Sequence, residues 1–113
     1  GLVGSEMCIR DRNLPIIVTG DFNAVPSDEP IQVLTNPSDP RHLTHSRTIA
    51  GFIYGPEWTF HDFGKIPYDK REWIDYIFVK GNIKVLRHGV LTETLNNLFP
   101  SDHCPVISTL ILE

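Results

Sequence analysis

The sequence is short of cysteine and of positive charge, and it has no long apolar run. Its two cysteines, Cys8 and Cys104, are too few for a disulfide framework or a zinc cluster. No apolar stretch approaches the roughly 20 residues of a membrane-spanning helix. The 10 Lys and Arg residues are outnumbered by 14 Asp and Glu, which gives a formal net charge of -4. This balance provides no overall attraction to nucleic acid or to anionic lipid, so any phosphate binding must be local.

The remaining composition is that of a soluble globular protein. Hydrophobic residues make up 41% and charged residues 21% of the chain, and 113 residues form at most one domain. The composition does not indicate in which cellular compartment the protein is found. Most of the basic residues fall between positions 65 and 87, which is interpreted either as an ordinary solvated face, the commoner case, or as a track for phosphates. They are Lys65, Lys70, Arg71, Lys80, Lys84 and Arg87.

The first twelve residues, "GLVGSEMCIRDR", look foreign to the rest of the chain. They show no strand or helix period and lack the long apolar centre of a signal peptide. From Leu2 to Arg12 they fit an in-frame translation of a transposase-type sequencing adapter. We therefore expect residues 1–12 to be a non-native, adapter-derived segment and residues 13–113 to form the domain. The alternative is a natural N-terminal helix or loop.

Two elements are expected in the first third of the domain. The apolar run Ile16–Val18, which ends at Gly20, predicts a buried strand that delivers Asp21 and Asn23 to a loop. Ser27 is then a candidate N-cap for a short helix that places Ile31 and Leu34 on one face. Residues 37–56 are expected to form a long surface connection, with a helical turn near Leu43.

Four strands are expected in the remainder of the chain. Residues 57–63 and 72–80 are aromatic and β-branched, as strands prefer. In the second of these, alternation places Asp75 on the same face as Ile77 and Val79, so an aspartate stands on an otherwise apolar face. A Gly-Asn turn predicts that the strand starting at Ile83 pairs with the preceding one. The apolar tail at 105–113 predicts a closing strand.

Three polar groups of residues interrupt these apolar runs: "GDFN", "IDYIF" and "SDH". Each lies beside a segment that would hold it rigidly, as functional sites require. Taken singly, each also has an ordinary explanation. Asp21 and Asn23 suit a turn, Asp75 suits a solvent-facing strand position, Asp102 suits a helical cap, and His103 suits a loop.

Taken together, the three motifs resemble the endonuclease/exonuclease/phosphatase family of metal-dependent phosphoesterases. The resemblance covers residues 14–112 and rests on "GDFN" after an apolar strand, "IDYIFV" in mid-chain and "PSDHCPV" before the last strand. The stretch "GPEWTFHDFG" is similar to a bacterial branch in which Thr-Phe-His precedes the Ile-Asp-Tyr strand. The resemblance implies an α/β fold, namely the C-terminal half of a four-layered α/β/β/α sandwich. The expected half is mainly one mixed or antiparallel sheet with a covering short helix.

The resemblance also implies a role for each polar residue. Asp21 would orient or deprotonate the attacking water, and Asn23 would donate its amide to a phosphate oxygen. Asp75 would fix the tautomer of His103, which would act as a base or stabilise developing negative charge. Asp102 would bind a metal ion, directly or through water. Carboxylates suit a hard cation, so Mg²⁺ is the expected cofactor, with Mn²⁺ as the alternative.

The sequence departs from the family pattern at several positions. The metal-binding glutamate that members carry well before "GDFN" is missing, so we expect the chain to be inactive by itself. We also expect it to fold poorly alone, because one sheet would lack the half of the sandwich that covers its inner face. Many members have Arg where this chain has Trp73, and Arg71 is only a weak substitute. His61 matches a branch-specific position and suits either packing or the edge of a substrate site.

The leading hypothesis is therefore a truncated magnesium-dependent hydrolase that cleaves phosphodiester or phosphomonoester bonds by in-line attack of water. Its substrate would be a nucleic acid, a nucleotide, a sugar phosphate or a lipid headgroup, and the sequence indicates no obligate protein partner. The alternative is a non-catalytic interaction module that retains the phosphoesterase fold, which would be expected to have lost site residues. A third hypothesis is a coincidence of motifs in a generic α/β protein. Convergence of the polar residues on one pocket would argue against it.

Overall fold

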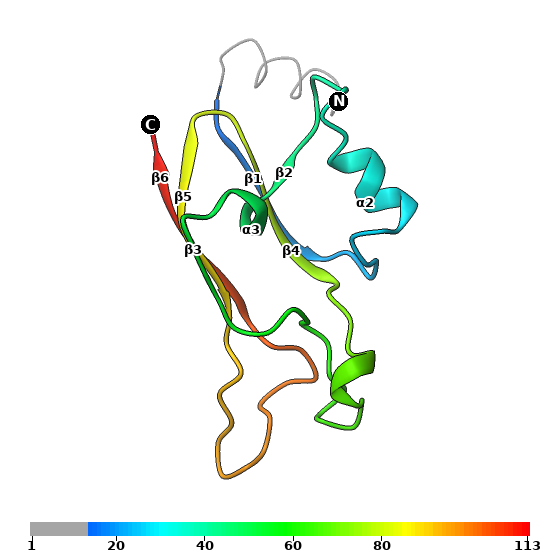
Figure 1. The fold of residues 1–113 in the computed structure, drawn as a ribbon. Coiled ribbons are helices and arrows are strands. Elements are labelled where there is room, and N and C mark those ends of the chain that lie inside the picture. The colour runs from blue at the N-terminus through cyan, green and yellow to red at the C-terminus, as the bar shows by residue number, and fades with distance from the viewer. Residues whose placement is uncertain (1–13) are drawn as a thin grey trace, which may run out of the picture.

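The computed structural model describes residues 14–113; the adapter-like segment expected at 1–12 lies outside the described residues. Short helices and strands alternate in the first two thirds of the chain, and consecutive strands complete it (Figure 1). The elements are β1 (Ile16–Asp21), α2 (Glu29–Leu34), β2 (Thr44–His45), α3 (Ser46–Ile49), β3 (Phe52–Tyr54), the 3₁₀ helix η1 (Tyr68–Lys70), β4 (Asp75–Lys80), β5 (Ile83–Val90) and β6 (Val106–Leu112). None of the helices in the described part is long and apolar enough to cross a membrane.

The strands form two sheets of three strands each, in the orders β1-β4-β2 and β3-β5-β6. The first sheet is antiparallel, and the second pairs β5 parallel with β3 and antiparallel with β6. In Figure 1, α2 and the second sheet flank the first sheet on opposite sides, and α3 contacts both β4 and β5. The expected α/β fold is confirmed, with its strands divided between two sheets rather than gathered mainly in one.

The division into two sheets corrects the prediction that the strand starting at Ile83 pairs with the preceding one. The turn at Gly81 and Asn82 does not close a hairpin, because β5 leaves the first sheet and pairs with β3 and β6 in the second. Gly81 adopts a φ of +97° with Pro15 packed close to its Cα, a position where a side chain would be strained. The turn therefore carries the chain from one sheet to the other.

Three local predictions also require correction. Helix α2 starts after Asp28 rather than Ser27, with Pro30 in its first turn. The stretch 37–56 is not an unbroken surface connection, because it contains β2, α3 and β3, and its helical turn lies at Ser46–Ile49 rather than near Leu43. Residues 57–63 are irregular: among them only Phe60 forms isolated bridges, and Trp58 packs in the core without joining a ladder.

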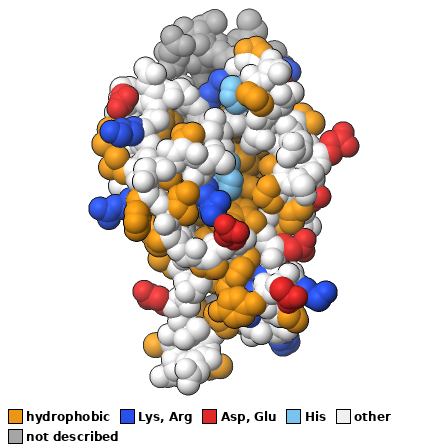
Figure 2. Space-filling model, viewed as in Figure 1, with side chains coloured by type: hydrophobic (Ala, Val, Ile, Leu, Met, Phe, Trp, Pro, Cys, Tyr) orange, Lys and Arg blue, Asp and Glu red, His pale blue; other side chains and the backbone are white. Residues whose placement is uncertain are grey.

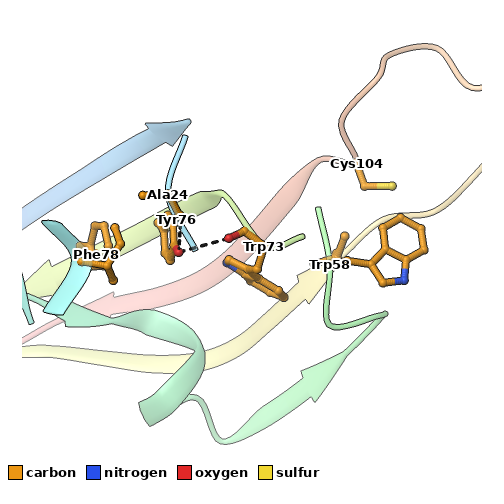
Figure 3. Packing of buried hydrophobic residues seen from close by; sticks show 8 residues of the cluster. Ala24, Trp58, Trp73, Tyr76, Phe78 and Cys104 are labelled. Carbon is orange, nitrogen blue, oxygen red and sulfur yellow. Dashed lines mark hydrogen bonds between the residues drawn. The ribbon is translucent and has the colours of Figure 1, made fainter. Parts of the chain in front are cut away.

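A buried aromatic cluster packs the first sheet against the loops that follow β1 and precede β4. Tyr76 and Phe78 of β4 stack with their ring centroids 4.9 Å apart, and Phe22 packs edge-on against both rings. The Tyr76 hydroxyl donates to the carbonyl oxygens of Ala24, at 2.7 Å, and Trp73, at 3.2 Å (Figure 3). The hydroxyl accordingly ties the loop after β1 to the segment that enters β4. Both connections lead to predicted site residues.

A second buried group lies where the two sheets meet. The imidazole rings of His45 in β2 and His88 in β5 are 5.5 Å apart, and Trp73 stacks on His88 at 5.7 Å. His88 is fully buried, and neither of its ring nitrogens has a hydrogen-bond partner. Burial lowers the pKa of both histidines to about 4. These side chains hold the sheets together in the neutral form.

The basic stretch between residues 65 and 87 does not form a continuous phosphate track. The guanidinium of Arg71 lies between the rings of Tyr68 and Trp58, at 4.2 Å and 4.4 Å. Lys80 Nζ donates to the carbonyl oxygen of Pro40 at 2.6 Å. On the face drawn in Figure 2, the Lys and Arg side chains are spread over the surface, several of them beside Asp or Glu, and do not gather into one patch. At least two of these basic residues therefore serve the fold.

Candidate active site

The three polar motifs meet at one end of the first sheet. Asp21 ends β1 and Asp75 begins β4, and the antiparallel register places them directly opposite each other. The loop before β6 brings His103 against both carboxylates. One ligand atom from each of these three residues lies within 4.8 Å of the others. Residues far apart in the sequence are thus gathered into a single cluster.

His103 is held by Asp75. Its Nδ1 lies 2.8 Å from Asp75 Oδ2, at the distance of a strong hydrogen bond. An ionised carboxylate can only accept, so Nδ1 carries the proton and Nε2 of the neutral ring is left as an acceptor. The Asp75 side chain is 19% exposed and therefore shielded from competing water. This arrangement fixes both the orientation and the tautomer of the imidazole.

The free Nε2 of His103 faces two further carboxylates. It lies 3.8 Å from Asp21 Oδ2 and 3.9 Å from Asp102 Oδ1. Both distances exceed a direct hydrogen bond and suit a bridging water. Burial lowers the pKa of His103, but the hydrogen bond to Asp75 and the negative charges of Asp75, Asp102 and Asp21 outweigh burial and raise the pKa above its ordinary value.

Asn23 lies beside this cluster because the chain turns sharply after β1. The Asn23 backbone N–H donates to Asp21 Oδ1 at 2.8 Å, and Asn23 has a φ of 51°. Asn tolerates this left-handed conformation better than most residues. The side chain of Asn23 is exposed and lines a pocket of about 180 Å³ together with Asp21 and His103. The Asp21 carboxylate thus also shapes the loop after β1, which presents the side-chain amide of Asn23.

Two open pockets adjoin the group formed by Asp21, Asp75 and His103, which we call the Asp-His cluster. The larger, of about 450 Å³, is lined by Asp21, Asp75 and His103 and extends along the ends of β1 and β6. The smaller pocket adds the side chains of Asn23, Asp28, Phe60 and Glu72. Within the described residues, neither pocket is lined by Lys or Arg. A phosphate group would need a cation here, since the nearby carboxylates would otherwise repel it.

The donor set suits a hard divalent cation. Because Asp75 already accepts the imidazole N–H, the two carboxylates that face His103 Nε2 and are left to bind a cation are Asp21 and Asp102. Their side chains are 47% and 43% exposed, and Asp102 Oδ1 accepts a long hydrogen bond, 3.4 Å, from Ser101. Oxygen ligands and accessible water are typical of magnesium and manganese sites. The residues present therefore fit part of the ligand set of such an ion.

Two positions singled out by the family resemblance, Trp73 and His61, are used for packing. Trp73 is 6% exposed and lies against His88, so the position held by Arg in many members is inside the core here. His61 is fully buried, with its ring 4.1 Å from that of Phe99, and its Nδ1 accepts from the Gly64 N–H at 3.0 Å. These contacts support the packing interpretation of His61 over a role at a substrate edge.

Several residues around the site could not be predicted from the sequence. Thr59, Phe60, Asp28 and Glu72 all contact the cluster or line its smaller pocket. Asp28 and Glu72 resemble ordinary surface acids, and no local pattern distinguishes them. The Thr-Phe-His stretch did carry a signal, but the signal predicted a strand, whereas residues 59–61 are irregular and hydrogen-bond to the segments on either side of them.

Comparison with known proteins agrees with the motifs. A family model described as "Endonuclease/Exonuclease/phosphatase family" matches residues 2–103. A solved structure of an endonuclease/exonuclease/phosphatase from Bacteroides vulgatus is 30% identical with a TM-score of 0.84, and the match covers 99% of this chain and 42% of that one. A family protein from Bacteroides thetaiotaomicron is 32% identical with a TM-score of 0.80, covering 99% and 43%.

A further solved structure carries a specific activity in its name. The mannosyl-6-phosphatase of Bacteroides thetaiotaomicron is 31% identical with a TM-score of 0.78, and the match covers 97% of this chain and 43% of that one. This chain thus spans less than half the length of each of these relatives. None of the curated proteins matches the sequence.

Proposed function

This chain belongs to the endonuclease/exonuclease/phosphatase family, and from that premise we propose that its Asp-His cluster is part of an active site that hydrolyses a phosphate ester by in-line attack of water. The observation that carries the proposal is the geometry of His103. Its Nδ1 is bound to Asp75 at 2.8 Å, while its Nε2 faces Asp21 at 3.8 Å. An oriented imidazole opposite a carboxylate is an arrangement able to hold and deprotonate a water molecule.

Each residue then has a role in the reaction. The attacking water is held between Asp21 Oδ2 and His103 Nε2, and one of these two groups accepts its proton. Asn23 donates its side-chain amide to a non-bridging phosphate oxygen. Asp75 keeps the Nδ1–H tautomer in place throughout. Phosphoryl transfer requires positioning and charge stabilisation more than covalent chemistry, which suits this set of residues.

We propose Mg²⁺ as the cofactor, with Mn²⁺ as a substitute, held by Asp102 and Asp21. When bound, the ion would neutralise charge that develops on the transferred phosphoryl group. The chain's own contribution is to present two accessible carboxylate side chains on the Nε2 side of His103. The absence of Lys and Arg from the lining of the described pockets supports a metal ion as the counter-charge.

We further propose that the substrate is a phosphomonoester of a neutral, hydroxyl-rich compound, such as a sugar phosphate. Asp28 and Glu72 line the smaller pocket beside His103, where their carboxylates can accept hydrogen bonds from hydroxyl groups. The same carboxylates would repel the additional phosphates of a nucleic acid. The likeness to a mannosyl-6-phosphatase agrees with this choice.

The working enzyme, in this proposal, includes a part that this chain does not contain. The chain spans 42% of its Bacteroides vulgatus relative, and the group of described residues that could hold a metal ion, Asp21, Asp75 and His103, contains no glutamate. Activity is therefore expected of the full-length gene product and not of the 113 residues alone. The retention of Asp21, Asn23, Asp75, Asp102 and His103 in one cluster counts against a purely non-catalytic interaction module.

A substrate panel tests the proposal. The full-length gene product and the 113-residue chain are each assayed in Mg²⁺ with mannose 6-phosphate, p-nitrophenyl phosphate, bis-p-nitrophenyl phosphate and an oligonucleotide. We expect the full-length protein to prefer mannose 6-phosphate and the short chain to be inactive. A preference for the oligonucleotide would contradict the substrate class, and no hydrolysis of any ester would contradict the proposed function.

A further inference from the structure

Thr59 lies between the two segments that supply the Asp75–His103 pair, namely the start of β4 and the loop before β6, although it lines neither pocket. Its side chain is fully buried, and its backbone hydrogen-bonds to both segments. A buried hydroxyl must find hydrogen-bond partners, so the partners of Thr59 show what it holds in place.

The Thr59 side chain holds the start of β4, which carries Asp75. Its Oγ1 accepts from the backbone N–H of Ile74 at 3.0 Å and from that of Asp75 at 3.2 Å. The backbone N–H of Thr59 donates to the carbonyl oxygen of Glu72 at 3.0 Å. One side-chain oxygen therefore binds two successive amides at the start of β4, where the strand must place the Asp75 carboxylate.

Residues 59–61 also hold the loop before β6, which carries His103. The carbonyl oxygen of Thr59 accepts from the Cys104 N–H at 2.7 Å. Phe60 forms an isolated bridge with His103, and its ring centroid lies 4.9 Å from the imidazole. The backbone N–H of His61 donates to the carbonyl oxygen of Asp102 at 3.0 Å. Residues 59–61 accordingly link both partners of the Asp75–His103 hydrogen bond.

We propose that Thr59 is a positioning residue, whose hydroxyl holds the start of β4 so that Asp75 Oδ2 stays within hydrogen-bond reach of His103 Nδ1. The structural part of this inference rests on geometry alone, and its catalytic consequence rests on the proposed function. A methyl group in place of the hydroxyl would leave two buried amides without an acceptor, and the strand end would shift to find another. A displacement of about 1 Å is enough to lower a reaction rate roughly 10²-fold.

The test compares variants that keep or remove the acceptor. Thr59→Val is nearly isosteric but has no acceptor, Thr59→Cys has only a weak one, and Thr59→Ser retains the hydroxyl. Thr35→Val is the matched control, because Thr35 Oγ1 also binds a backbone group, the carbonyl oxygen of Ile31, in helix α2 away from the site. All variants are made in the full-length gene product, and folding is followed by thermal unfolding.

The first measurement is the tautomer of neutral His103, read by NMR from protein labelled with ¹⁵N at histidine. We expect the Nδ1–H form to dominate in the parent, in Thr59→Ser and in Thr35→Val, and to give way to a mixture in folded Thr59→Val or Thr59→Cys. If Thr59 had a merely structural role, Thr59→Val and Thr59→Cys would lower the stability of the protein without changing the tautomer of His103. An unchanged Nδ1–H form in a folded variant without the acceptor would overturn the inference.

The second measurement is hydrolysis. We expect kcat to fall about 10-fold to 100-fold in Thr59→Val, with KM changed by less than about twofold, and to be largely restored in Thr59→Ser. If the tautomer changes but the parent hydrolyses no ester, the proposed function fails and the positioning role stands. If the parent is active while Thr59→Val keeps both its tautomer and its kcat, the positioning role fails alone.

Discussion

Asp21 and Asp75 lie directly opposite each other on adjacent antiparallel strands, and His103 contacts both carboxylates. Like charges at directly opposed positions destabilise a sheet, so nothing in the packing of β1 against β4 favours this pair. Local features that oppose stability are characteristic of functional sites. The pair is best explained by the chemistry proposed for it. On this explanation, replacing one of the two carboxylates should lower activity without lowering stability.

Replacing Asp21 with Asn should leave stability unchanged or raise it slightly while greatly lowering turnover. The amide removes the repulsion between Asp21 and Asp75, but it cannot accept a proton from water. We expect kcat of the full-length protein to fall about 10²-fold to 10⁴-fold. The measurements are steady-state hydrolysis and urea unfolding of the same preparations. Near-normal turnover would refute the role assigned to Asp21.

Asp75 and His103 should act as one unit. We expect His103→Ala and Asp75→Asn each to lower kcat by about 10²-fold to 10⁴-fold. The second change replaces an acceptor-only carboxylate with a neutral amide that can also donate, so the tautomer of the imidazole is no longer fixed. In the double variant the losses should not add, since Asp75 acts through a ring that is no longer present.

The control for this pair is His42→Ala, since His42 Nδ1 lies 2.7 Å from the backbone oxygen of Asp39, on the connection after α2. Its kcat should remain at the parental value. Fully additive losses in the double variant would mean that Asp75 and His103 work independently.

Stability should fall as the pH is lowered from neutral towards 4, because of the histidines between the sheets. His45 and His88 have a pKa of about 4 in the folded protein, compared with about 6.5 for an unfolded chain. The unfolded state therefore binds more protons across this interval, and the stability present above pH 6.5 is lost as the pH falls. The fully buried His88 alone could account for about 3 kcal/mol.

Urea unfolding between pH 7 and pH 4 measures this effect. The positive charge of Arg47 faces both rings and also disfavours their protonation. We expect His88→Leu to flatten the pH dependence, whereas His42→Gln, which lies outside this contact, should keep it. An identical slope in His88→Leu and in the parent would exclude His88 as a source.

Removing divalent metal should abolish hydrolysis reversibly. Dialysis against EDTA is expected to eliminate activity, and Mg²⁺ or Mn²⁺ should restore it. Asp102→Asn should raise the Mg²⁺ concentration needed for half-maximal activity about tenfold, because it replaces a charged oxygen ligand with a neutral one. Asp69→Asn, in the exposed 3₁₀ helix η1, provides the control. Full activity in EDTA would contradict the proposed cofactor.

Local patterns predicted the elements that rest on apolar runs and failed where pairing is long-range. The strands beginning near Ile16 and Val106 were visible as short apolar stretches between turn signals. The turn at Gly81 resembled that of a hairpin, but β5 pairs with β3 and β6, and nothing near the turn specifies partners so distant. The aromatic stretch that begins at Trp58 resembled a strand, but Trp58 is buried without joining a ladder and Phe63 is exposed.

The candidate site was more predictable than the topology, because its residues occur in ordered motifs with apolar flanks. Asp21, Asp75 and His103 were singled out from the sequence, and the structure places them within contact of one another. Thr59 could not be singled out in this way. Its importance lies in hydrogen bonds to amides 15 and 16 positions further along the chain, which no local pattern encodes.

The central claim is that water attacks phosphorus in a site that contains Asp21 and His103. Single-turnover hydrolysis of mannose 6-phosphate in ¹⁸O-labelled water, with the full-length protein and Mg²⁺, tests this claim most directly. The account predicts one ¹⁸O atom in the released phosphate and none at the C6 oxygen of the sugar, at a rate that falls sharply in Asp21→Asn and His103→Ala. Label at the C6 oxygen, or an undiminished rate in both variants, would contradict it.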